Sequence, residues 1–157
     1  MEFILLIVLG LGALIYFGTN SSQGNSIVSQ VVNTASAAVN GGNLSAQDIA
    51  TLASNAGFTG DDIATATSIA SAESGGDPNA YNPETKAGAP QGMGSYGLWQ
   101  IYLNAHPEFA GYNLFDPLEN ASAAYQVWES SGFRAWSTYK DGEYQAFIDT
   151  AIGAVNS

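Results

Sequence analysis

One glutamate in this sequence, Glu73, has a position that suits acid catalysis. A short helix is predicted to begin at Gly60 and to end at the glycine pair that starts with Gly75. At 100° per residue, Glu73 shares a helix face with four apolar residues, Ile63, Ala66, Ile69 and Ala70. Burial on that face, and the negative end of the helix dipole, both raise the pKa of a carboxyl group. An acid that stays protonated near neutral pH can serve as a general acid.

Two segments that follow the helix supply groups that could bind a ligand. The first is a run of turn-forming residues from Gly75 to Pro83, which contains Tyr81 and Asn82. The second is Gly-Ser-Tyr-Gly-Leu-Trp-Gln-Ile at 94–101. Its glycines let the backbone approach a ligand closely. Its side chains that can stack or form hydrogen bonds are Ser95, Tyr96 and Gln100.

The order of these pieces resembles the lytic transglycosylase (goose-lysozyme-like) family, whose members cleave peptidoglycan. The pieces are Glu-Ser at 73–74, the loop, and Gly-x-x-Gly-Leu-x-Gln-Ile at 94–101. The segments 113–125 and 136–139 look like later blocks of the phage-type transglycosylase-like domains. The resemblance covers roughly residues 45–145. It implies a mainly α fold of the α+β lysozyme-like kind, in which a compact helical domain carries a long loop or small β lobe beside a cleft.

The resemblance also implies a role for each candidate residue. Glu73 would be the single catalytic acid and base, acting on the bond between N-acetylmuramic acid and N-acetylglucosamine and leaving a 1,6-anhydro product. The residues implied to bind substrate are Ser95, Tyr96, Gln100, Tyr81, Asn82, Trp136 and Tyr139, with packing as the alternative for the last two. The sequence departs from the family in having Tyr96 where Ser is common and Trp99 where Met is common. The family's Ala-Tyr-Asn-Ala-Gly block is also missing.

Other functions stay open at this point. Most glycosidases use two carboxylates, and the candidates for a second are Asp77, Glu84 and Asp116, each placed where a turn or a helix cap would use it. A hydrolytic muramidase that uses Asp77 or a held water is therefore an alternative. A structural membrane or virion protein that binds glycan without cutting it is another. No metal or other cofactor is expected, because the only histidine, His106, has no cluster of ligands at suitable spacing.

The charge balance limits the partners. The chain has 3 Lys+Arg against 14 Asp+Glu and a formal net charge of −11. No basic patch can be built from so few cations, so a nucleic-acid partner is excluded, and docking on anionic lipid headgroups is disfavoured. Because peptidoglycan is itself negatively charged, its binding must rely on contacts with the sugars. Cysteine is absent, so disulfides and thiolate metal sites are not available.

We predict three parts along the chain: an anchor at 1–19, a partly helical spacer at 20–43, and the lysozyme-like domain at 44–157. Residues 3–17 carry no charged side chain, and a helix through residue 19 comes near the shortest length that spans a bilayer. A removed signal peptide is less favoured, because Glu2 precedes the run without any Lys or Arg. The expectation is a single-pass anchor that contacts the lipid bilayer through residues 3–19, in a virion inner membrane or in a bacterial envelope facing the periplasm.

Helix start and stop signals divide the domain itself. Ser45 followed by Asp48 predicts a capping box, and Asp116-Pro117-Leu118-Glu119 predicts a second strong helix start. Gly132 predicts the end of the helix that begins there. A last helix is expected from residue 141 to about 155, with its apolar residues closing the core.

Overall fold

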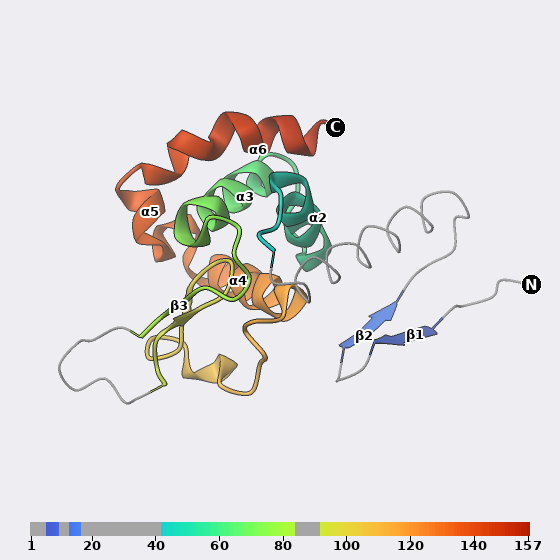
Figure 1. Cartoon of the computed structure of the whole chain (residues 1–157), viewed down its shortest axis with the longest axis vertical. Helices are drawn as coiled ribbons and strands as arrows, with labels where there is room; N and C mark the ends of the chain where they lie inside the picture. The colour runs from blue at the N-terminus through green and yellow to red at the C-terminus, as the bar shows by residue number, and fades with distance from the viewer. Residues whose placement is uncertain (1–5, 10–12, 17–41, 84–91) are drawn as a thin grey trace, which may run out of the picture.

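The computed structural model describes residues 6–9, 13–16, 42–83 and 92–157 (Figure 1). Its α-helices are α2 (Ala46–Ala56), α3 (Asp61–Ser74), α4 (Pro117–Ser131), α5 (Ser137–Lys140) and α6 (Ile148–Val155). Three short 3-10 helices accompany them: η1 (Pro107–Phe109), η2 (Phe133–Ala135) and η3 (Glu143–Phe147). An antiparallel sheet of order β3-β4-β5 is formed by Tyr81–Asn82, Ser95–Tyr96 and Ile101–Tyr102. The predicted class, a mainly helical domain with a small β lobe, is confirmed.

The described part of the N-terminal apolar run is extended. Strand β1 (Leu6–Leu9) pairs antiparallel with β2 (Ala13–Tyr16), with Leu6 opposite Tyr16. The helix predicted over 3–19 is therefore corrected at these positions. Ile7, Val8 and Ile15 are β-branched and favour strands, and the glycines in the run lower its helix propensity. The rest of that range and nearly all of the spacer at 20–43 lie outside the described residues. Within the described part of the chain, no helix is long and apolar enough to cross a membrane.

The predicted helix starts are confirmed, with one difference. Ser45 and Asp48 form the complete capping box at the start of α2. At the start of α4, the Asp116 carboxylate accepts hydrogen bonds from the N–H groups of Leu118 and Glu119. Glu119 stands where a capping box would bond it to the backbone N–H of Asp116, but its carboxylate accepts from the backbone N–H of Asn113 instead, at 2.8 Å. It thereby ties the preceding loop to the helix.

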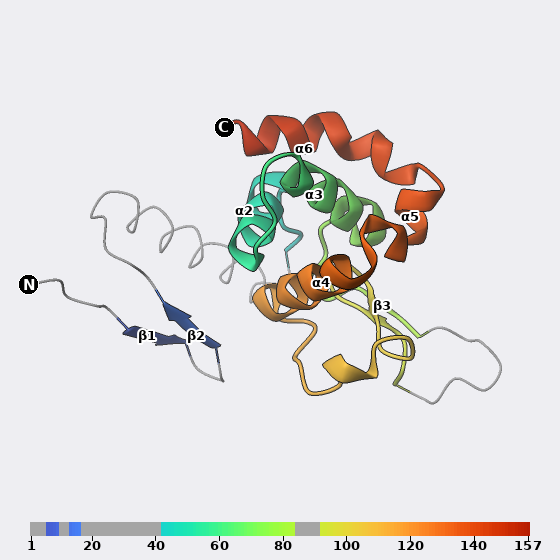
Figure 2. The ribbon, with the colours of Figure 1, turned by 180° about the vertical axis from the view of Figure 1, so that it is seen from behind.

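Helix α3 is the centre of the helical part (Figures 1 and 2). It contacts α2, α5, η3 and α6, and Ala64, Ala66 and Ile69 are among its buried residues. Thr67 and Ser68 are also fully buried, and their hydroxyls donate to backbone carbonyls one turn back, at 2.7 and 2.8 Å. Such local bonds satisfy the polar atoms, so a helix built from small side chains can be surrounded on several sides. Gly75, in the left-handed conformation, ends it as predicted.

Trp99 connects the elements around α3. Its side chain is 1% exposed, and its ring N–H donates to the carbonyl of Ala66 on α3 at 2.9 Å. Its backbone N–H donates to the Asn120 side chain on α4 at 2.9 Å. Its own carbonyl accepts from the ring N–H of Trp136 at 2.8 Å. The segment around residue 99 is thus held to three distant parts of the chain by buried hydrogen bonds.

The C-terminal region differs from the single helix that the sequence predicts. Gly142 is left-handed, with φ of 80°, and the chain continues as η3 before α6 begins at Ile148. Of the apolar residues expected in the core, Ala151 is buried, whereas Phe147 is 39% and Ile152 is 46% exposed. The tighter winding of a 3-10 helix changes the residue spacing, so a 3.6-residue pattern drawn across the junction no longer holds.

Candidate active site

Glu73 lies in the last turn of α3, where the helix meets α5 and η3. Its side chain is partly buried, and its Oε1 accepts a hydrogen bond from the Thr138 hydroxyl at 2.8 Å. Thr138 is itself buried, with 8% exposure. The backbone N–H of Thr138 also forms a hydrogen bond with this carboxyl group. The site therefore presents one carboxyl group that Thr138 holds through both its hydroxyl and its backbone.

The surroundings raise the pKa of Glu73. Burial, which disfavours the charged form, is the largest cause, and the nearby carboxylate of Glu143 acts in the same direction. The hydrogen bonds from the hydroxyl and from the backbone N–H of Thr138 oppose them and lower the pKa. Burial prevails, so the protonated acid persists to a higher pH than on an exposed glutamate. The direction predicted from the apolar helix face is confirmed.

Thr138 is the site residue that sequence reasoning missed. It lies 65 residues from Glu73, in a short helix that no periodic pattern marks. Its position follows from Trp136, two residues earlier, whose buried ring N–H is bonded to the Trp99 carbonyl. One signal was present in the sequence: the segment 136–139 stands in the region of the family's missing Ala-Tyr-Asn-Ala-Gly block. That signal marked the segment but did not single out Thr138 within it.

The side chain of Gln100 is hydrogen-bonded to the loop that follows the Glu73 helix. Its side-chain nitrogen donates to the carbonyls of Ala80 and Gly97, at 3.2 and 3.0 Å. Two backbone turns, from Ser74 to Asp77 and from Asp77 to Ala80, join that loop to the end of α3. Gln100 also has φ of 46°, the one positive φ of a non-glycine residue among those described. Such backbone conformations cost free energy and are concentrated at functional sites.

The sheet brings together the predicted residues Tyr81, Asn82, Ser95 and Tyr96. Tyr81 is paired with Tyr96 and Asn82 with Ser95. Ser95 is buried, while Asn82 is exposed. Tyr96 is partly buried, and its hydroxyl donates to the carbonyl of Gly92 at 2.6 Å. The aromatic rings of Tyr81 and Tyr96 lie 4.8 Å apart, and Tyr81 is 45% exposed.

Trp136 and Tyr139 lie elsewhere. Trp136 is 6% exposed and belongs to the hydrophobic core, so the structure places it where the packing alternative puts it. Tyr139 is partly buried, and its ring stacks on Tyr144 at 4.8 Å and contacts Phe133 at 5.6 Å. Both residues therefore support the α5 segment that carries Thr138.

The structure describes two of the three candidates for a second carboxylate, and both bond the backbone. Asp77 accepts from the backbone N–H of Asn79 at 2.8 Å, and Asp116 caps α4, as their positions in the sequence suggested. Glu84 lies outside the described residues. The carboxylate that does influence Glu73 is Glu143, at the start of η3, which the sequence analysis did not single out.

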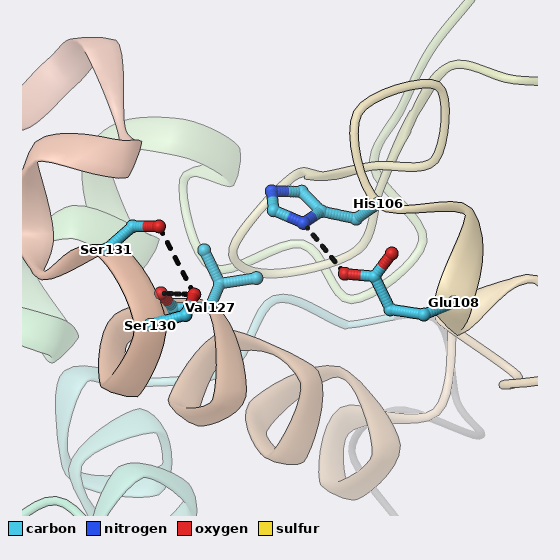
Figure 3. Close-up of polar contacts among 5 residues, drawn as sticks. All are labelled: His106, Glu108, Val127, Ser130 and Ser131. Carbon is cyan, nitrogen blue, oxygen red and sulfur yellow. Dashed lines mark hydrogen bonds and ion pairs between the residues drawn. The ribbon is translucent and has the colours of Figure 1, made fainter.

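The His106 side chain contacts a carboxylate two residues further along the chain. Its Nδ1 lies 3.1 Å from Oε1 of Glu108, two residues on, and Figure 3 shows the imidazole directed toward that carboxylate. The same figure shows Ser130 bonded to the Val127 carbonyl and to Ser131 on α4. Among the residues that the structure describes, no group of three or more His, Cys, Asp or Glu side chains could hold a metal ion.

A hollow of about 230 Å³ lies away from this site. It is formed by α2, the beginning of α3 and the end of α6, and it is lined by residues that include Gln47, Asn55, Ile63 and Val155. None of the predicted site residues and no carboxylate lines it. It offers no group that could act as an acid, so we do not connect it with catalysis.

The described domain is thus a small helical body that holds a partly buried acid, Glu73, at the end of α3 and carries a short three-stranded sheet, as expected of a lysozyme-like fold. The family model described as "Lysozyme like domain" matches residues 50–138, more than half of the chain. The protein belongs to this family. The matched range includes Glu73, Gln100 and Thr138. Searches of curated proteins and of solved structures found no match. Membership implies action on the glycan of peptidoglycan.

Proposed function

We propose that this protein is a lytic transglycosylase that cleaves the β-1,4 bond between N-acetylmuramic acid and N-acetylglucosamine. The observation that carries the proposal is the state of Glu73: partly buried, raised in pKa, and bonded at Oε1 by Thr138. A single acid with a raised pKa can complete this reaction, because the substrate supplies its own nucleophile.

The proposed reaction uses Glu73 twice. Its proton passes to the bridging oxygen, and the bond from that oxygen to C1 of the muramic acid breaks. The resulting carboxylate then takes the proton of the C6 hydroxyl of the same sugar. The C6 oxygen attacks C1 and closes a 1,6-anhydro ring, which leaves Glu73 protonated again. Acid–base catalysis of this kind contributes a rate factor of about 10²–10⁴.

The engagement of two of the candidate acids, Asp77 and Asp116, supports the single-acid reaction. Asp77 and Asp116 are both bonded to backbone N–H groups, where they stabilise a turn and a helix start. The side-chain nitrogen of Gln100 is bonded to Ala80 and Gly97, and within the described part of the chain no group donates to its amide oxygen, which can accept a hydrogen bond from a sugar. We assign to it the positioning of the muramic acid.

A hydrolytic muramidase is the second candidate, and one observation favours it. The carboxylate of Glu143 is near enough to Glu73 to raise its pKa. A second carboxylate at a suitable distance could activate a water molecule, as in inverting glycosidases. The products of the two reactions differ, because hydrolysis leaves a reducing end and transglycosylation leaves an anhydro end.

Mass spectrometry of the muropeptides released from purified peptidoglycan tests the proposal. We expect anhydromuramic ends, which are lighter than reducing ends by one water molecule. Reducing ends alone would reject the transglycosylase and establish the hydrolase. A protein that binds glycan without cutting it would release no muropeptides at all.

Membrane attachment through residues 3–19, in a virion or a bacterial envelope, remains part of this proposal. It is supported by the apolar sequence of the run alone. Flotation of the full chain with neutral phosphatidylcholine vesicles checks it. Protein that stays at the bottom of the gradient would count against attachment.

Replacing Thr138 by Val is expected to move the pH profile as well as the rate. The hydroxyl lowers the pKa of Glu73, so its removal raises that pKa. Activity that needs the protonated acid is lost as pH rises through this pKa, so the alkaline limb of kcat/KM shifts to higher pH. We expect kcat to fall about 10–100-fold, because the hydroxyl no longer helps to orient the Glu73 carboxyl group.

Thr138→Ser is the matched control, because it keeps the hydroxyl and removes only a methyl group. It should retain most of the rate and the original alkaline limb. If Ser and Val variants have the same pH profile as the wild type, Thr138 serves only to pack α5 against α3.

A further inference from the structure

Two of the protein's few cationic side chains lie close together in the chain. They are Arg134, in η2, and Lys140, at the end of α5. The third cationic residue, Lys86, lies outside the described residues. The stretch 133–140 contains no Asp or Glu, although the formal net charge of the whole chain is −11. We call this stretch the cationic segment.

Both cations of the segment are exposed and unpaired. Within the described part of the chain, neither side chain forms a hydrogen bond or an ion pair, and the ion pair found there joins His106 to Glu108 instead. The chain has 14 Asp+Glu, so the lack of a partner does not come from a shortage of carboxylates. An arginine can bind a carboxylate through two parallel hydrogen bonds, and a lysine acts on it as a point charge. The cationic segment is therefore equipped to bind an anionic group of a ligand.

Two buried residues fix the cationic segment beside the candidate acid. Trp136 is 6% exposed and bonded within the core, and Thr138 is 8% exposed and donates to Glu73 at 2.8 Å. Four residues span at most about 14 Å and two residues at most about 7 Å. The backbones of Arg134 and Lys140 lie within these distances of Thr138. Both cations thus border the place where α5 contacts the end of α3 (Figures 1 and 2).

The acids around the segment do not neutralise it by direct pairing. Glu129, Asp141 and Glu143 are the nearest acids along the chain, and none of them is within ion-pair distance of either cation. Charges further away than about 8 Å are largely screened at physiological ionic strength. An anion at the segment therefore interacts mainly with the two cations and the nearest acids, and only weakly with the rest of the negative charge.

The proposed substrate carries anionic groups on the sugar that Glu73 would act on. Muramic acid differs from glucosamine by a lactyl group on O3, which ends in a carboxylate or carries a peptide with carboxylates of its own. The C1 and C6 atoms of the proposed reaction belong to the same ring as O3. From the sequence, binding of peptidoglycan was expected to rely on contacts with the sugars alone. The position of the cationic segment adds a contact for the charged substituent.

We propose that Arg134 and Lys140 bind a carboxylate carried by the lactyl group of muramic acid, either that of the lactyl group itself or one of the attached peptide. This inference rests on the proposed function, because it takes the muramic acid at Glu73 as the ligand. The two cations would favour strands that contain muramic acid over neutral glycans. The segment that bonds the acid through Thr138 would then also orient the sugar through its substituent.

Binding in the absence of cleavage tests this site. The full chain carrying Glu73→Gln is titrated with six-sugar peptidoglycan strands in three forms: with peptides, without peptides but with free lactyl carboxylates, and without peptides but with those carboxylates converted to methylamides. Adding Arg134→Gln and Lys140→Gln should weaken binding of a carboxylate-bearing strand about tenfold and leave the methylamide strand unchanged. The carboxylate-bearing form that is weakened identifies which carboxylate is bound. Unchanged affinity for both carboxylate-bearing forms would overturn the proposal, as would equal weakening for all three.

Two controls separate a local contact from an effect of net charge. Arg134→Lys with Lys140→Arg keeps both charges and should retain most of the binding. Asp61→Asn with Asp62→Asn, added to the double glutamine variant, restores the original net charge from the opposite end of α3, about 17 Å from Glu73 along the helix axis. These added changes should not restore binding, and recovery would overturn the proposal. Because both cations are exposed, we expect the unfolding temperature to stay unchanged in the double glutamine variant.

Failure of this site and failure of the proposed function give different results. A wild-type protein that releases no anhydromuramic ends, together with cation variants that lose only carboxylate-bearing strands, would reject the transglycosylase and leave the site standing. A wild-type protein that releases anhydromuramic ends, together with cation variants that bind all three strands as before, would reject the site alone.

Discussion

Replacing Glu73 by Gln is expected to abolish clearing of purified cell wall in a zymogram, with a loss of at least about 10²–10⁴ in rate. Gln has nearly the same shape, and its carbonyl oxygen can still accept from the Thr138 hydroxyl. It has no acidic proton to give to the bridging oxygen and no carboxylate to take one back. The substitution therefore removes both proposed steps while it preserves the contact at Oε1.

The same substitution should leave the stability of the fold unchanged or raise it. The folded-state pKa of Glu73 is raised, so its contribution to stability is complete at acid pH and is lost as pH rises through that pKa. Gln at this position remains neutral throughout. We therefore expect Glu73→Gln to unfold at the same or a higher temperature than the wild type at neutral pH, with the difference vanishing at acid pH.

Two outcomes would contradict this assignment. Clearing that survives Glu73→Gln would remove Glu73 from catalysis. A loss of clearing that is matched by a fall in unfolding temperature would reduce the result to damaged folding. Glu129→Gln, on the exposed surface of α4, is the matched control and should leave both the rate and the unfolding temperature unchanged.

Replacing Asn120 by Leu is expected to have the largest effect on stability. Asn120 is completely buried, and its side chain donates to the carbonyls of Tyr96 and Leu114 and accepts from the Trp99 N–H, all at 2.9 Å. Leu fills a similar volume but satisfies none of these three backbone groups. Each buried group left without a partner costs about 1–3 kcal/mol. The sum is comparable to the whole stability of a typical domain, about 5–15 kcal/mol.

Urea unfolding at neutral pH, followed by circular dichroism, measures this effect. Asn104→Leu is the control, because Asn104 is exposed and bonded only to the Tyr102 hydroxyl among the described residues. It should change the free energy of unfolding by less than about 0.5 kcal/mol. A loss below about 1 kcal/mol for Asn120→Leu would mean that water or other groups replace its three bonds.

Gly97 belongs to the same arrangement. It has φ of 70°, and a Cβ atom there would lie 2.5 Å from the Asn120 side-chain nitrogen and would collide with the Leu114 carbonyl. Glycine at this position therefore allows the Asn120 side chain to reach the backbone of Tyr96 and Trp99 within the segment 94–101 and that of Leu114 after it. From the sequence, the glycines at 94–101 were expected to let the backbone approach a ligand. In the structure, Gly97 instead allows close packing against Asn120.

Local patterns account for what could be predicted about the helices. The start of α2 at its capping box, the start of α4 at Asp116 and the ends of α3 and α4 at glycines all depend on residues within one turn of each other. Such signals are read directly from the order of the residues. The prediction of one helix from residue 141 to about 155 was wrong. After Gly142 the chain forms a 3-10 helix, in which the spacing of residues on one face differs from that of an α-helix.

By itself the sequence determined that this protein is a small, acidic, mainly helical domain with one glutamate on the apolar side of a helix end. These properties depend on composition and on residues a few positions apart. The tertiary structure alone decided that Thr138 bonds this acid, that Trp136 is core rather than a sugar contact, and that Tyr96 lies against Phe115. Contacts between residues far apart in the chain depend on how the helices pack, and no local spacing encodes that packing.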